Sequence, residues 1–138
     1  MLLLEFSCSG VLAFGAFGED VRARLGASEA QLQLIASAGL VGITLSALPG
    51  AVYDRRGATA TTAAGAGLLL AGYGLSFATL ARRWPWPLFL LGWFLVGHAG
   101  SWLYTTALVS NVANFAPELR GYVAGACTAF FGLSIATL

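Results

Sequence analysis

Charged residues in this chain of 138 residues are confined to a few short clusters. The uncharged intervals around those clusters are residues 6–18, 30–53, 57–81, 84–117 and 121–138. A membrane-spanning helix needs about 20 consecutive apolar residues. Three of the intervals exceed that length, and the two shorter ones adjoin the ends of the chain. The pattern therefore predicts a multi-pass integral membrane protein with five helices, of which the first and last are shortened.

The composition excludes several classes of protein. Charged residues make up 9% of the chain, whereas a soluble domain has about 25%. The net charge is +1, and because no basic patch is present we expect no nucleic-acid partner. Nucleophile-elbow, phosphate-loop and paired-carboxylate patterns are absent from the sequence, so we expect no enzyme activity and no cofactor. Cys8, Cys127 and His98 lack zinc-ligand spacing, so we expect no metal.

We predict a single transmembrane domain over residues 1–138, folded as an all-α, five-helix partial bundle. The expected helices cover residues 2–21, 29–52, 59–80, 88–112 and 121–138. Ser28 and Gln31 form an expected capping box at the start of the second helix, and Pro49 predicts a kink in its last turn. A cleaved signal peptide over residues 1–17 is an alternative to the first helix, but Glu5 interrupts the required apolar run.

A short charged turn, residues 50–57, separates the second and third expected helices. Its glycines permit a sharp turn, and Asp54 and Arg55 can bond each other or a neighbouring helix. The turn resembles the loop between helices 2 and 3 of major facilitator superfamily transporters, Gly-x-x-x-Asp-Arg-x-Gly, through Gly50, Asp54, Arg55 and Gly57. The resemblance implies a cytoplasmic gating latch that includes Arg56. The alternative is a solvated turn whose charges stop the helices at the interface.

Short segments along nearly the whole chain resemble the nodulin-like branch of the same superfamily. They are Phe14-Gly15, Leu25-Gly26, Gln31-Leu32, Gly72-Tyr73-Gly74, Trp102, Thr105-Thr106-Ala107, Asn114-Phe115, Arg120-Gly121 and Gly132-Leu133-Ser134. The resemblance implies a transporter of about twelve helices in two related halves, of which this chain supplies the first five. The expected partners are therefore the lipid bilayer, a small-molecule solute, and the remaining helices of the transporter or a second membrane subunit.

The implied function is to move a small solute across a membrane by alternating access, driven by a gradient. Two alternatives stay open, namely a helix-docking or assembly module that transports nothing, and a truncated gene product. The arginines divide almost evenly between the two sides, so charge alone sets no orientation. The sequence likewise leaves open the solute, the coupling ion, the direction and the organelle.

Six residues are candidates for lining the cavity, binding the solute or relaying a proton. They are His98, Trp102, Thr105, Thr106, Asn111 and Glu5. Ionisable groups inside a membrane are costly and often functional, and the resemblance implies that the fourth helix lines the cavity. The alternatives are hydrogen bonds between helices for the residues of the fourth helix, and an interfacial position near a helix N-terminus for Glu5.

Overall fold

The computed structural model describes residue 11 and residues 13–136, with side chains up to residue 130. This part of the chain is all-helical and contains no strand. The elements are α2 (Phe14–Leu25), α3 (Glu29–Thr44), α4 (Ala47–Arg82), α5 (Trp86–Ala113), a short 3₁₀ helix η2 (Pro117–Leu119) and α6 (Arg120–Ala136). The predicted all-α class is therefore confirmed.

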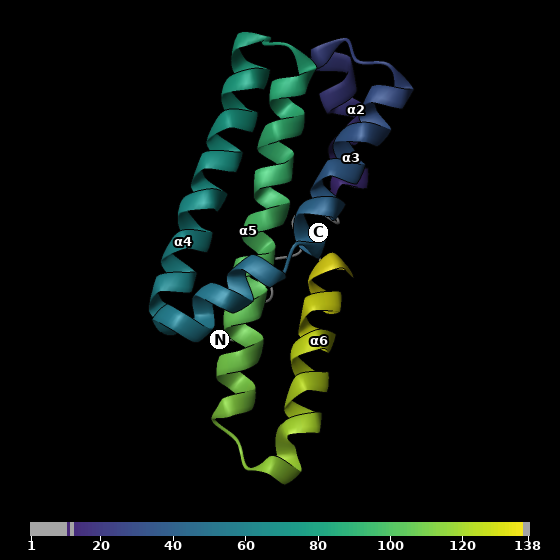
Figure 1. The fold of residues 1–138 in the computed structure, drawn as a ribbon. Coiled ribbons are helices and arrows are strands. Elements are labelled where there is room, and N and C mark those ends of the chain that lie inside the picture. The colour runs from purple at the N-terminus through teal and green to yellow at the C-terminus, as the bar shows by residue number, and fades with distance from the viewer. Residues whose placement is uncertain (1–10, 12, 137–138) are drawn as a thin grey trace.

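Helix α5 is the central element, because α3, α4 and α6 all pack against it. Figure 1 shows α4 antiparallel to α5 along most of its length, whereas α3 covers one half of α5 and α6 the other. The connections α2–α3 and α4–α5 lie at one end of the structure and the α5–α6 connection at the opposite end (Figure 1). Near the middle of α5, therefore, the packing of α3 against α5 ends and the packing of α6 against α5 begins.

Glycines allow the close approach of α3 to α5. A Cβ atom added at Gly97 would overlap the backbone carbonyl oxygen of Gly39, and one added at Gly42 would lie 2.5 Å from the carbonyl oxygen of Phe94. Helices in a membrane associate chiefly through such tight packing, since lipid is as apolar as their side chains. The position of α3 on α5 therefore depends on the absence of side chains at these glycines.

An aromatic cluster around Trp93 fixes the other end of α5. The Trp93 ring stacks on Phe89 with centroids 6.0 Å apart and meets Phe14 of α2 at 5.1 Å. The predicted capping box opens α3 beside this cluster, with Ser28 Oγ accepting from the Gln31 backbone N–H at 3.3 Å and Gln31 Oε1 from the Ser28 N–H at 2.9 Å. The aromatic contacts therefore hold α2 against α5, and the capping box fixes the residue at which α3 begins.

Two stretches, Glu29–Arg82 and Trp86–Ala113, are long and apolar enough to cross a membrane. The outer face of α4 is strongly apolar, with 77% of Leu70 and 73% of Phe77 exposed. A large apolar surface of this kind marks contact with lipid or with other helices.

The structure differs from the expected second and third helices in where the chain bends. Helix α3 ends at Thr44 instead of continuing to Val52. The chain becomes helical again at Ala47, and the turn before the long part of α4 lies at the single residue Gly57 (φ 77°, ψ −176°). Glycine alone adopts that backbone region readily. We therefore divide α4 into segment 47–56 and segment 58–82, which meet at a sharp angle (Figure 1).

Candidate functional site

The break between α3 and α4 has its cause in Pro49. The backbone leaves helical geometry at Leu45 (φ −79°, ψ 66°), four residues before the proline. Proline has no N–H to donate to the carbonyl four residues earlier, and its ring clashes with that carbonyl. The Leu45 carbonyl therefore loses its partner within the helix, and inside a membrane, where no water replaces that partner, it needs another.

Helix α5 supplies hydrogen-bond donors to the carbonyls at this break. The hydroxyl of Ser101 donates to the Leu45 carbonyl at 3.3 Å. One turn earlier on α5, Nδ1 of His98 lies 3.3 Å from the Gly42 carbonyl oxygen. Because unsatisfied backbone groups are costly inside a membrane, these two side chains stabilise the end of α3 where it stops.

His98 makes a second hydrogen bond that determines which ring nitrogen carries the proton. The Trp102 indole N–H donates to His98 Nε2 at 3.0 Å, and an indole nitrogen can only donate. Nε2 is therefore an acceptor, and the network assigns the proton to Nδ1, which donates it to the Gly42 carbonyl. The predicted alternative role of His98, a hydrogen bond between helices, is thus observed, while solute binding or proton transfer stays a prediction.

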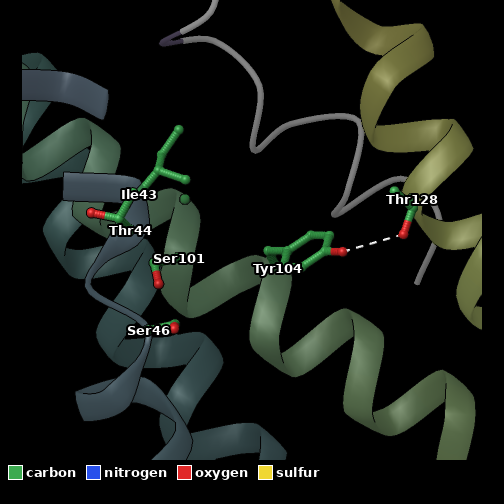
Figure 2. A pocket seen from close by; sticks show the side chains of 7 residues that line it. Ile43, Thr44, Ser46, Ser101, Tyr104 and Thr128 are labelled. Atoms are coloured by element: carbon green, nitrogen blue, oxygen red, sulfur yellow. Dashed lines mark hydrogen bonds between the residues drawn. The ribbon is translucent and has the colours of Figure 1, made fainter. Parts of the chain in front are cut away.

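A cavity of about 360 Å³ lies beside the break, between α3, the connection from α3 to α4, α5 and α6. Its lining residues are Ile43, Thr44, Ser46, Gly100, Ser101, Tyr104 and Thr128 (Figure 2). None of these residues is charged, and five of them carry a hydroxyl group. Ser101 is close to the middle of α5, so in a spanning helix the cavity lies near the middle of the bilayer.

The hydroxyl groups of the cavity are held by local hydrogen bonds. Thr44 Oγ1 donates to the Val41 carbonyl at 2.8 Å, and Thr128 Oγ1 donates to the Ala124 carbonyl at 3.0 Å. The Tyr104 hydroxyl of α5 lies 3.4 Å from Thr128 Oγ1 of α6, as Figure 2 shows. The cavity therefore presents several oxygen atoms in fixed positions between largely apolar walls.

The candidate residues predicted on α5 lie outside this cavity. The Thr106 hydroxyl is buried and donates to the Trp102 carbonyl at 3.0 Å, and Asn111 Nδ2 donates to Cys127 Sγ of α6 at 3.4 Å. Thr105 is half-buried. The structure thus brings His98 and Trp102 together, but neither residue lines the cavity. Glu5 lies outside the described residues.

The charged turn motif lies at the end of segment 47–56. Asp54, Arg55 and Arg56 are exposed, and their side chains form no ion pair or hydrogen bond within residues 13–130. Of the two motif glycines, Gly57 makes the turn, whereas Gly50 is helical. Tyr53 ties the segment to α5 through its hydroxyl, 2.9 Å from that of Ser110. The charges are therefore free to meet a partner or to remain solvated.

Comparison with known proteins places the chain in a family. A family model described as Nodulin-like matches residues 2–138. The chain belongs to the Nodulin-like family. No curated protein and no solved structure matches it. The resemblance seen in the sequence is thus confirmed at the level of the family.

Family membership and the helices agree on the class of protein. The Nodulin-like family is transporter-like and not enzymatic in character, and two stretches of this chain can cross a membrane. The Nodulin-like chain is therefore a membrane protein with a transporter-related role. In the part that the structure describes, no three His, Cys, Asp or Glu side chains gather where they could hold a metal ion.

Sequence reasoning missed the residues that line the cavity of this Nodulin-like chain. The available signal was the proline, because its steric effect falls on the carbonyl four residues earlier. Counting back from Pro49 reaches Leu45, which Thr44 and Ser46 flank. A hydroxyl on each side of a freed carbonyl inside an apolar span would have identified the break as a candidate site.

Proposed function

We propose that this chain forms part of a gradient-driven secondary transporter of the major facilitator superfamily, which moves a small solute across a membrane by alternating access. The observation that carries the proposal is the broken helix α3–α4 beside an uncharged, hydroxyl-lined cavity at the middle of α5. Irregular backbone inside a membrane is tolerated only where protein buries it or where it lines a cavity. Broken helices near the bilayer midplane are typical of the substrate sites of secondary transporters.

The five predicted helices then form one wall of the transport pathway. In the proposal, α2 to α6 belong to five spanning helices, and the remaining helices of the transporter or a second membrane subunit complete the opposite wall. The exposed apolar face of α4, which includes Leu70 and Phe77, offers one surface for such packing. The same face favours the second candidate function, a helix-docking module that transports nothing.

Uptake by proteoliposomes distinguishes the two functions. We expect vesicles that contain the purified protein, with any membrane partner that co-purifies, to accumulate a small solute when a proton or sodium gradient is imposed. An ionophore that collapses the gradient should abolish accumulation, and added ATP should not restore it. Protein-free vesicles provide the control. Stable association with a specific membrane partner, without uptake under any imposed gradient, would instead support the docking module.

The proposed gating latch can be tested separately. We expect Asp54→Asn to lower the uptake rate about tenfold, the effect of losing about 1.4 kcal/mol of a charge-assisted contact, while membrane insertion stays normal. Asp20→Asn is the matched control, because Asp20 is equally an exposed carboxylate but lies on α2 outside the motif. Initial uptake rates at equal protein per vesicle measure the effect. Equal uptake rates for the Asp54 variant and the unmodified protein would contradict the gating latch and support the alternative, a solvated turn.

A further inference from the structure

The hydroxyl protons around the cavity are almost all used by the protein itself. Thr44, Ser101 and Thr128 each donate to a backbone carbonyl, at 2.8, 3.3 and 3.0 Å respectively. A hydroxyl group has one proton to donate and two lone pairs that accept. Each of these three groups can therefore accept a hydrogen bond from a ligand but has no proton left to give.

The other two hydroxyl groups of the cavity differ from these three. Because the Thr128 proton goes to the Ala124 carbonyl, Tyr104 is the donor in its 3.4 Å hydrogen bond with Thr128. Ser46 is the N-cap residue of α4, and its hydroxyl makes no capping hydrogen bond. Within the cavity lining, Ser46 is thus the residue whose hydroxyl proton is available to a ligand.

This arrangement disfavours charged ligands of either sign. A carboxylate needs several donors to replace its water, and the lining offers one. A cation in an apolar region needs a negative partner, and no lining residue is charged. The His98 ring, three residues before Ser101 on α5, has both nitrogens engaged with Gly42 and Trp102.

We infer that this cavity binds a neutral solute rich in hydrogen-bond donors, a small polyol, and rejects small carboxylates and ammonium compounds. Several O–H groups of a polyol would donate to the lone pairs of Thr44, Ser101 and Thr128, and one oxygen would accept from Ser46. Its C–H faces would lie against the apolar walls, and the volume of about 360 Å³ accommodates a six-carbon ring. The inference rests on the proposed function, since it names the class of solute carried.

Equilibrium binding to the full chain in lipid nanodiscs tests the inference without requiring transport. The probes are radiolabelled myo-inositol, pyruvate and methylammonium. We expect saturable binding of myo-inositol and none of pyruvate or methylammonium at equal concentration. Thr128→Val should weaken myo-inositol binding about fivefold, because it removes one accepting oxygen from the cavity.

Thr79→Val is the matched control for the threonine variant. Thr79 makes the same kind of bond, from its hydroxyl to the carbonyl of Leu75 at 2.7 Å, but it is buried on α4 away from the cavity. Its variant should bind myo-inositol normally. If Thr128→Val does not fold, Thr44→Val provides the second test, with weaker myo-inositol binding expected because it removes another accepting oxygen of the cavity.

The outcomes separate this inference from the proposed function. Binding of pyruvate or methylammonium in preference to myo-inositol, no binding of myo-inositol, or equal binding by the cavity variants and the Thr79 control would overturn the inference. Gradient-driven uptake of a carboxylate without myo-inositol binding would overturn it while leaving the transporter intact. Myo-inositol binding that Thr128→Val weakens, with no uptake under any gradient, would support the cavity assignment and contradict transport.

Discussion

Replacing Gly97 by alanine is expected to destabilise the packing of α3 on α5 by about 1–3 kcal/mol. The added Cβ atom would overlap the carbonyl oxygen of Gly39, which is backbone and cannot rotate away as a side chain would. Alanine favours a helix over glycine by about 1 kcal/mol, and that gain only partly offsets the overlap. The helices must therefore separate, which moves the end of α3 away from its hydrogen-bond donors on α5.

Gly67→Ala is the matched control for this prediction. Gly67 lies within α4, and a Cβ atom added there would meet nothing within 4 Å. The same glycine-to-alanine change should therefore leave the stability unchanged or raise it slightly. Thermal melting followed by circular dichroism in one detergent measures both variants. A Gly97 variant that melts at or above the temperature of the Gly67 variant would show that α3 and α5 are not in close contact.

The start of α3 and both ends of α5 were predictable because they depend on neighbouring residues. The capping box of Ser28 and Gln31 marks the start of α3 as expected, and the expected helix over residues 88–112 differs from α5 by two residues at one end and one at the other. Charges and prolines interrupt apolar runs at these points. Local signals of this kind act within a few residues, so a single sequence contains them.

The sequence predicts a kink near Pro49, in the last turn of the expected helix over residues 29–52. In the structure the helix instead stops at Leu45, four residues earlier. The proline disturbs the carbonyl four residues earlier, and whether a helix then bends or stops depends on partners elsewhere. Here the Ser101 hydroxyl of α5 stabilises the end of α3, because it donates a hydrogen bond to the Leu45 carbonyl. That donor lies 56 residues away in the sequence, so no local pattern shows it.

The site was harder to predict than the helices because two neighbouring residues of a helix point in different directions. Ser101 lines the cavity, whereas Trp102 points to His98. The sequence shows that α5 is rich in polar and amphipathic groups, but which of them face a cavity depends on where α3 ends and α6 begins. Those positions follow from the tertiary packing.

The His98 network gives the second large expected effect. His98→Ala should lower the stability by about 1–3 kcal/mol, because it leaves the buried Trp102 N–H without its acceptor and the Gly42 carbonyl with one donor fewer. Trp102→Phe removes the other partner of the same bond. The double variant should therefore be less destabilised than the sum of the two, by about 0.5 kcal/mol or more. Strict additivity in thermal or denaturant unfolding would contradict the 3.0 Å hydrogen bond.

His98→Gln separates this structural role from the predicted transfer of protons. A glutamine amide can donate to the Gly42 carbonyl and accept from Trp102, as the neutral ring does, but it does not titrate. We therefore expect His98→Gln to recover much of the stability that His98→Ala loses. If His98 also relays protons, the glutamine variant should still lose the pH dependence of uptake. A stable glutamine variant with an unchanged pH profile would leave His98 as a positioning residue that holds α3 at its break.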